Sequence, residues 1–459
     1  MRDLTTGSVT KHLLQLTAFT SMAVVFLTLY HLADIYWVGR LGKEAIAAVG
    51  LAGNLLFVVM ALGQTLAIGI STLVSHATGA KDQARARLLF NQGVVFGALA
   101  GLAILAAGFA VRPFYFSALG ADGATAMLGK QYLFWLLISF WIQITGMSLG
   151  GALRGIGDLK TPMIINGGSV LLNVFLDPVL IFGWGPVPKL GVAGASLATV
   201  ISAVLGGVLL LWHFSRAQSY LRFNPSQWRP RWSLLKQITI IGAPAGAQTG
   251  LLSAINLMLV FWVISPFGAA AQAGFGVGIR VMMSLMMPVV AIAFATSPLV
   301  GQNFGARQPD RVRQAYRSAA LLAGGLSLVL MVVCQAAPAW FIRLFSSDPA
   351  VVAYGSDYLR IIAWAFLPAS LVHVSSSAFQ GLGNTLPVLV GAVARLAAFT
   401  IPVILIARWS GFEVVQVWYL AVASSVLQMG LNLYLLNRAF RNRLQFAPVA
   451  PLAQEPASD

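Results

Sequence analysis

The sequence predicts an all-α membrane protein in which twelve transmembrane helices form two six-helix lobes related by a parallel pseudo-two-fold repeat. The first observation is composition: 58% of the 459 residues are hydrophobic and only 9% are charged, whereas soluble domains carry roughly 25% charged residues. The second is a series of apolar runs, each long enough to cross a hydrocarbon core of roughly 30 Å. The third is a repeat that relates the two halves of the chain.

The apolar runs follow one another along the whole length, six in each half. No short apolar region with a small-residue cleavage site precedes the first run, so we expect that run to be retained as a helix. The single cysteine, Cys334, cannot form an intrachain disulfide and is interpreted as a small core residue. The predicted spans are residues 13–38, 45–73, 88–111, 127–150, 161–184, 189–214, 236–264, 269–300, 317–341, 357–379, 386–408 and 413–437.

A polar stretch in the middle of the chain separates the lobes. SRAQSYLRFNPSQWRPRWSLLK (215–236) contains two prolines and five basic residues, as expected of a cytoplasmic connector. The predicted domains are a first lobe at 1–214, a linker at 215–235, a second lobe at 236–440 and a cytoplasmic tail at 441–459.

Basic residues are distributed unevenly between the two sides of the predicted bundle. The net charge is +16. With the N-terminus taken as cytoplasmic, 19 of the 29 lysines and arginines lie on the inner side, and the outer side holds only Arg40, Lys43, Arg112, Lys130, Lys189, Arg343, Arg360 and Arg408. This asymmetry obeys the positive-inside rule with both termini cytoplasmic, in the inner (plasma) membrane of the cell. Topology and anionic lipid therefore account for the charge, and we expect no nucleic-acid partner.

The two halves align at a constant shift of 226 residues. STLVSHATGAKDQARAR (71–87) lies over SPLVGQNFGARQPDRVR (297–313), and ALRGIGD (152–158) lies over AFQGLGN (378–384). Two glycines of the first half, Gly42 and Gly50, fall on Gly268 and Gly276. Because each half has an even number of spans, both enter the membrane in the same orientation. Transporters built from parallel repeats bind substrate between the halves and rock them to expose it alternately.

Two of the thirteen acidic residues lie inside predicted spans. Asp34 and Asp177 stand about equally far below the outer ends of spans one and five, roughly 8 Å deep at 1.5 Å per residue. A lone charge in the membrane costs at least ~2.5–3.5 kcal/mol, so an acid kept there usually faces a wet interior and has a function. The second half has no matching acids, because Asp34 aligns with Val260 and Asp177 with Pro402 once one deletion is allowed.

Polar neighbours at helical spacing accompany these acids. Asn173 lies four residues before Asp177, and its amide oxygen suits sodium or a hydrogen bond to a carboxylate. Pro178 frees a backbone carbonyl one turn back, a geometry that often lines ion sites. Tyr30 and His31 precede Asp34 by one turn and either tune its proton affinity and contact substrate or simply pack at the interface.

Three features of the spans have competing interpretations. The methionines Met282 and Met286 are either packing residues or the adaptable wall of a promiscuous cavity. The arginines Arg280 and Arg395 lie inside second-lobe spans, where we expect pairing with carbonyls or lipid phosphate. The string Gly155-Ile156-Gly157-Asp158 matches the GxGD pattern of intramembrane aspartyl proteases, but its repeat partner is Asn384, so a helix-ending turn is the better interpretation. No metal-ligand spacing or phosphate-binding glycine loop occurs.

Over residues 10–440 the sequence resembles the multidrug and toxic compound extrusion (MATE) family. The resemblance is carried by DIYWVGRLG at the end of span one, ALRGIGDLKTP before span five, LNVFLDP in span five, GVAGASLATVISA in span six and VGQNFGARQPDRV after span eight. Acids in spans one and five, without acids in spans seven and ten, resemble the DinF-like branch. One departure is Ala18, where family members commonly have a proline associated with bending of span one.

The resemblance implies an antiporter that exports organic cations and drugs in exchange for H⁺ or Na⁺, acting as a monomer without a cofactor. Asp34 and Asp177 match the family's acids, and Asn173 and Thr199 match the polar partners of its first-lobe cation site, which would bind Na⁺ if the exchange uses sodium. The residues that we expect at the substrate are Tyr30, His31, Gln143, Met282 and Met286. The alternatives are a flippase of lipid-linked precursors with the same fold and an intramembrane aspartyl hydrolase.

Overall fold

Helices form almost all of the computed structural model, which describes residues 2–185, 187–216, 220–258, 264–406 and 411–446. No strand occurs in these ranges, so the predicted all-α class is confirmed. The first lobe contains α1 (Val9–Gly39), α2 (Lys43–Gly79), α3 (Gln83–Ala118), α4 (Gly123–Gly155), α5 (Lys160–Phe182) and α6 (Val192–Ser215). The second contains α7 (Trp232–Met258), α8 (Ala269–Gly305), α9 (Pro309–Ala336), α10 (Pro338–Arg343), α11 (Pro349–Ile362), α12 (Phe366–Gly381), α13 (Leu386–Ile406) and α14 (Val414–Arg443).

Eleven helical segments of the described residues are long and apolar enough to cross a membrane. They match eleven of the twelve predicted spans, and the chain is a multi-pass membrane protein. The remaining prediction, span seven, corresponds to α7, which is described as far as Met258. Span ten begins earlier than predicted, because α11, a 3-10 turn at Ala363–Ala365 and α12 form one segment over Pro349–Gly381. The predictions for Val260, Arg408 and the tail beyond residue 446 lie outside the described residues.

The backbone repeats itself at the predicted shift. Helices α2 and α8 both begin and end 226 residues apart. Each is preceded by a glycine with a positive φ, +108° at Gly42 and +89° at Gly268. Two non-glycine residues with positive φ, Lys81 at +59° and Arg307 at +56°, are equally spaced. An internal repeat that preserves such uncommon conformations confirms that the lobes are two copies of one six-helix unit.

The lobes meet in a pair of equivalent contacts between α2 and α8. A Cβ at Gly79 would lie 1.9 Å from the backbone oxygen of Gln302, and a Cβ at Gly305 would lie 2.2 Å from that of His76. Gly79 and His76 are the repeat partners of Gly305 and Gln302. Only glycine lets the two backbones approach this closely. The reciprocity of the contacts indicates a pseudo-two-fold axis that passes between α2 and α8.

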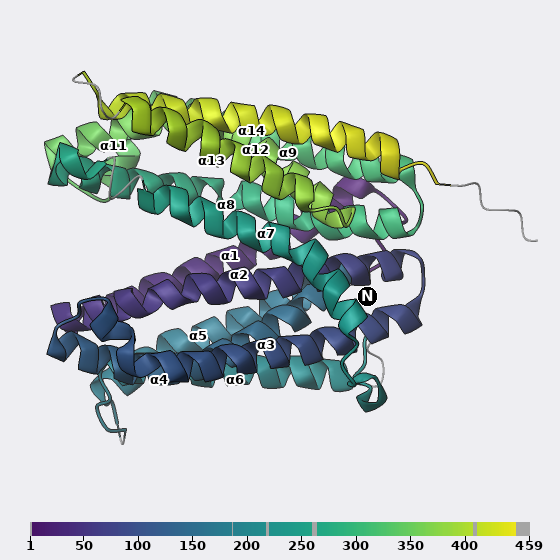
Figure 1. Ribbon diagram of the computed structural model, residues 1–459, viewed down its shortest axis with the longest axis horizontal. Coiled ribbons are helices and arrows are strands. Elements are labelled where there is room, and N and C mark those ends of the chain that lie inside the picture. The colour runs from purple at the N-terminus through teal and green to yellow at the C-terminus, as the bar shows by residue number, and fades with distance from the viewer. Residues whose placement is uncertain (1, 186, 217–219, 259–263, 407–410, 447–459) are drawn as a thin grey trace, which may run out of the picture.

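Side-chain hydrogen bonds across the lobes are reciprocal as well. The His76 Nε2 donates to the carbonyl oxygen of Gly381 at 2.6 Å, and the Gln302 Nε2 donates to that of Gly155 at 3.0 Å. The Gln302 Oε1 also accepts from the backbone N–H of Leu4 at 3.0 Å. These bonds lie at the end of the bundle where α1 begins, which the sequence predicts to be cytoplasmic and which we call the inner end. Figure 1 shows that the lobes are closer together there than at the opposite, outer end.

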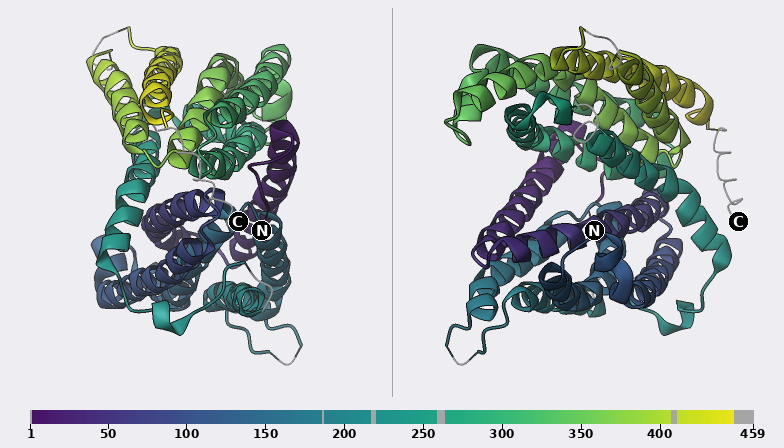
Figure 2. Two further views of the ribbon diagram at one scale, coloured as in Figure 1. Left: turned by 90° about the vertical axis from the view of Figure 1, so that its right-hand side faces the viewer. Right: turned by 60° about the vertical axis from the view of Figure 1, so that its left-hand side comes forward.

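Two helices pass from one lobe to the other. The first half of α1 packs into the second-lobe core through Leu13 and Leu16, while its second half runs beside α5. The first half of α7 packs against α2, where a Cβ at Gly242 would lie 1.8 Å from the backbone oxygen of Thr65. Figure 2 shows α1 in purple and α7 in teal crossing between the lobes. The first helix of each repeat is therefore shared by both lobes.

Candidate functional site

Close packing of α1, α5 and α6 positions the two predicted acids. A Cβ at Gly167 of α5 would lie 2.6 Å from the ring of Phe26 on α1, and a Cβ at Gly194 of α6 would lie 2.4 Å from the backbone oxygen of Leu180 on α5. Helix α5 continues through Pro178 and ends at Gly183, which has a φ of +76°. Small residues thus bring three helices together around the segment that carries Asp177.

The structure brings together five of the predicted site residues. Asp177 is fully buried and Asn173 is 1% exposed, and the Asn173 Nδ2 lies 3.5 Å from the Asp177 Oδ1. The Tyr30 hydroxyl on α1 lies 3.2 Å from the Thr199 Oγ1 on α6. Asp34, which is partly exposed, lies within electrostatic range of Asp177 and Tyr30. We call Tyr30, Asp34, Asn173, Asp177 and Thr199 the acid cluster.

The sequence did not predict Tyr132 at this cluster or two buried serines, each about one helical turn along the chain from a cluster residue. Tyr132 of α4 is 6% exposed and lies within electrostatic range of Asp34, Asp177 and Tyr30. The hydroxyls of Ser169 and Ser202 are buried and have no hydrogen-bond partner among the described residues. Helical spacing would have found the serines, because they lie four residues before Asn173 and three after Thr199. No sequence signal places Tyr132 there, since its helix belongs to another part of the lobe.

Two oxygen atoms of the cluster are available to a ligand. The Asp177 Oδ2 and the Asn173 Oδ1 are buried and accept no hydrogen bond in the described structure. An unsatisfied buried acceptor costs roughly 1–3 kcal/mol, more when it is charged. A proton on the carboxylate, or a sodium ion held by carboxylate and amide oxygens, would satisfy this site, because oxygen atoms are the ligands that hard cations prefer. No group of three His, Cys, Asp or Glu side chains that could hold a metal occurs among the described residues.

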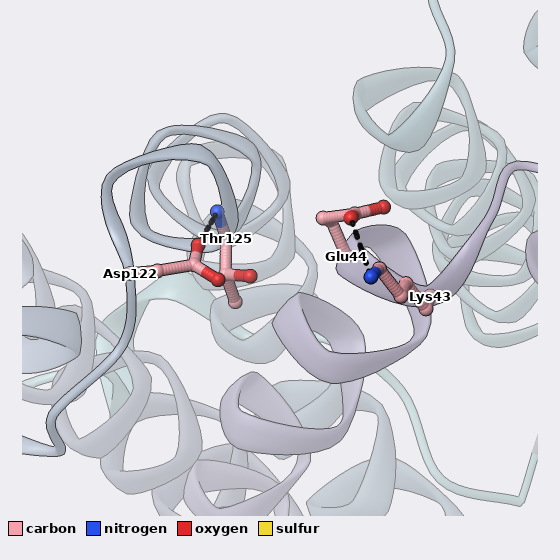
Figure 3. A network of polar contacts seen from close by, with 4 residues as sticks. All are labelled: Lys43, Glu44, Asp122 and Thr125. Atoms are coloured by element: carbon pink, nitrogen blue, oxygen red, sulfur yellow. Dashed lines mark hydrogen bonds and ion pairs between the residues drawn. The ribbon is translucent and has the colours of Figure 1, made fainter.

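Acids outside the spans have partners of their own. Figure 3 shows Glu44, 3.9 Å from the Lys43 Nζ, and Asp122, whose Oδ1 accepts from the Thr125 backbone N–H at 2.7 Å. This hydrogen bond lowers the pKa of Asp122 below its ordinary value. Asp158 lies just before α5 and its Oδ1 likewise accepts from a backbone N–H, that of Thr161, at 3.0 Å. The turn interpretation of the GxGD string is therefore confirmed.

The predicted substrate residues are divided between the lobes. His31 is exposed, and its ring packs edge-on against that of Tyr30 with centroids 5.2 Å apart. The Gln143 Nε2 donates to the Ser139 Oγ within α4 at 3.1 Å. Met282 accepts from the Tyr358 hydroxyl at 3.4 Å, and Met286 is buried in the second-lobe core. The contacts of the described residues do not join Gln143 or the methionines to the acid cluster, and their substrate roles stay predictions.

Comparisons with known proteins agree on the family. A family model described as MatE matches residues 20–179 and 244–406, one block in each lobe and more than half of the chain. An FAD transporter of Shewanella oneidensis is 28% identical over 418 residues, covering 89% of each chain. A probable multidrug resistance protein NorM of Thermotoga maritima is 28% identical over 414 residues, covering 88% of this chain and 87% of that one. The solved structure of a MOP superfamily transporter from Pyrococcus furiosus has a TM-score of 0.88 at 24% identity, covers 97% of this chain and 98% of that chain, and supports the fold.

Proposed function

Because the chain belongs to the MATE family of transporters, we propose that it is an antiporter that exports organic cations and drugs in exchange for H⁺ or Na⁺. The observation that carries this proposal is the acid cluster, in which two carboxylates share one lobe and the Asp177 Oδ2 accepts no hydrogen bond. Acids in the interiors of α1 and α5, with the second-lobe acids at or near the ends of their spans, also support assignment to the DinF-like branch.

The exchange works by competition at the acid cluster. Two unit charges about 4 Å apart interact by ~4 kcal/mol at an effective dielectric constant of 20. A hundredfold change in affinity needs only ~2.7 kcal/mol. An ion that neutralises Asp34 or Asp177 therefore weakens the hold of the cluster on a cationic drug enough to release it.

The arrangement of the lobes gives this exchange a direction. The lobes are joined at the inner end, and the acids lie in the halves of α1 and α5 nearer the outer end. An ion from outside enters this state through the outer end, and the drug leaves through the same opening. The reciprocal contacts of Gly79 and Gly305 must separate before the cluster is exposed to the cytoplasm.

The chemistry of the first lobe favours an organic cation as cargo. Tyr30 and Tyr132 place aromatic rings beside the two carboxylates, and aromatic faces and carboxylates both attract organic cations. Several arginines would suit the phosphates of a lipid-linked precursor, and the acid cluster contains none. Membership of a transporter family supports transport over the hydrolase alternative, and the GxGD aspartate, Asp158, bonds to Thr161 at the start of α5.

Transport by purified protein in liposomes tests the proposal. A pH gradient and a sodium gradient are imposed separately, and movement of tetraphenylphosphonium is followed. We expect one of the two gradients to drive transport, and Asp34→Asn to lose that coupling because the neutral amide cannot exchange an ion for the drug. Asp122→Asn is the matched control, since asparagine caps a helix as well as aspartate does. Full coupled transport by Asp34→Asn would contradict the proposal.

A further inference from the structure

The interior of the second lobe contains a guanidinium group without a carboxylate partner. Arg395 of α13 is partly buried, and its Nη1 donates to the Gln428 Oε1 of α14 at 3.4 Å, a long hydrogen bond. The ion pairs of the described residues, Lys43–Glu44 and Arg313–Asp310, do not include it. A cation held inside a membrane protein usually pairs with a negative group or marks a substrate pathway.

The direction of the Arg395 side chain excludes the surrounding lipid as its partner. The exposed apolar residues of α13 recur at helical spacing along one face: Leu386, Val390, Val393, Ile401, Ile404 and Leu405. The buried residues lie on the opposite face: Val388, Gly391, Ala392, Phe399 and Val403. At 100° per residue, Arg395 falls within the buried face, so its guanidinium points into the lobe. Of the two expected partners, carbonyls and lipid phosphate, the structure shows a carbonyl, the side-chain amide oxygen of Gln428.

Polar groups around the guanidinium also lack partners. The Gln428 Nε2 and the Asn432 Oδ1 are buried and form no hydrogen bond in the described structure. His373 of α12 and Tyr358 of α11 lie within electrostatic range of Arg395. We call Arg395, His373, Tyr358 and Gln428 the cationic cluster. It offers a guanidinium, the unpaired Gln428 amide N–H and an imidazole, which are donors that an anion needs, beside the Tyr358 phenol, which donates to Met282.

Aromatic rings lie beside this cluster. Tyr358 packs edge-on against Trp418 with ring centroids 4.9 Å apart, and Phe275 stacks on Trp418 at 5.3 Å. Binding sites for small organic molecules combine aromatic walls with a few convergent polar groups. The surroundings of Arg395 have this composition.

The repeat gives the cationic cluster a counterpart in the first lobe. ALRGIGD precedes α5 and AFQGLGN precedes α13, so α5 and α6 correspond to α13 and α14. Asn173 and Asp177 lie 3.5 Å apart on α5, and Arg395 on α13 contacts Gln428 on α14. The same pair of helices thus carries an acid in one lobe and a base in the other.

We propose that the cationic cluster is a binding site for the carboxylate group of an ampholytic organic substrate, complementary in charge to the acid cluster. This inference rests on the proposed function and narrows its substrate class. The planar guanidinium fork matches a carboxylate in two parallel hydrogen bonds, and the Gln428 Nε2 supplies a further donor. Molecules that carry both a cationic and an anionic group are then bound in preference to simple cations.

A pair of dyes that differ in one group tests the site. Rhodamine B carries a delocalised cation and a free carboxylate, and its ethyl ester carries the cation alone. Binding of each dye to purified protein is measured by fluorescence anisotropy near neutral pH. We expect Arg395→Gln to weaken the binding of rhodamine B by about 10- to 100-fold, the range of a charge-assisted hydrogen bond. The affinity for the ester should stay within about twofold of that of native protein. Arg395→Lys should recover part of the loss, because lysine restores the charge without the fork.

Arg280→Gln is the matched control, since Arg280 is an exposed arginine of the same lobe and its side chain has no hydrogen-bond or ion-pair partner among the described residues. It should leave both dyes unaffected. Equal losses of affinity for the two dyes in Arg395→Gln, or no loss for either dye, would overturn the inference. Binding of the ester but not of rhodamine B by native protein would overturn it as well. Native protein that binds neither dye and does not bind tetraphenylphosphonium would count against the proposed function itself. The thermal unfolding midpoint of each variant separates loss of the site from loss of the fold.

Discussion

The two lobes have the same backbone and opposite interior charge. Their equivalent helices α2 and α8 begin and end at repeat-related residues, after glycines with φ of +108° and +89°. Yet the first lobe holds Asp34 on α1 and Asp177 on α5, whereas the second holds Arg395 on α13, the counterpart of α5, at the position that corresponds to Ser169. The polypeptide path of the repeat is conserved while its chemistry has diverged.

The difference shows which residues the repeat can change. Gly79 and Gly305 each contact the opposite lobe, and the two contacts are related by the pseudo-two-fold axis. A side chain added at either position therefore disturbs the shared interface. Asp177 and Arg395 point into their own lobes, where a change of charge in one does not require a change in the other. The lobes are therefore symmetric where they touch, and their interior charges differ where they do not.

Neutralising one interior charge in each lobe should give the largest difference in transport between the two lobes. We expect Asp177→Asn to slow ion-coupled efflux of tetraphenylphosphonium by about 100-fold or more, since the lost interaction is worth ~4 kcal/mol at close range. Arg395→Gln should leave efflux of this simple cation within about twofold, because the cation has no anionic group to bind. Both are measured as initial rates in liposomes under the gradient that drives native protein. Equal rates for the two variants would mean that the lobes do not differ in function as their charges suggest.

Adding one methyl group at the interface should have the same effect from either lobe. Gly79→Ala and Gly305→Ala place a Cβ 1.9 and 2.2 Å from opposing backbone oxygens. We expect each to destabilise the inner-end contact by about 1–3 kcal/mol, because the backbones must move apart. With Cys334→Ser as background, the rate of thiol labelling at Ser75→Cys reports opening, since Ser75 is buried at this interface.

Gly50→Ala and Gly276→Ala are the matched controls, because they are also repeat partners and an added Cβ would meet nothing within 4 Å. Neither should raise the labelling rate. A large effect of Gly79→Ala with none for Gly305→Ala would contradict the symmetric interface.

Local patterns in the sequence were sufficient for the repeat, the acids and their nearest partners. Asn173 lies one helical turn from Asp177, and periodicity alone predicted their proximity, which the structure confirms at 3.5 Å. Motifs and glycines at a constant shift of 226 residues predicted the repeat, and the even number of spans in each half predicted that it is parallel. The turn at Asp158 was predicted from the glycines before it.

Contacts between distant helices could not be predicted in this way. Tyr132 reaches the acids from α4, and nothing in its own segment indicates the direction of its side chain. His76 and Gln302 donate to backbone carbonyls, which every residue possesses, so the partner leaves no signature in the sequence. The crossing of α1 into the second lobe depends on packing of Leu13 and Leu16, which in the sequence resemble any other lipid-facing leucines.

The smallest expected effect concerns two strained turns that the lobes share. Lys81 and Arg307 follow α2 and α8 with φ of +59° and +56°, where a side chain costs energy that glycine avoids. We expect Lys81→Gly and Arg307→Gly each to stabilise the protein by about 0.5–1 kcal/mol, less than the full relief because glycine gains freedom in the unfolded chain. Thermal unfolding in detergent measures both. Lys81→Ala and Arg307→Ala remove the same charges without relieving the strain, so a gain from alanine equal to that from glycine would assign the effect to charge rather than to the repeated turn.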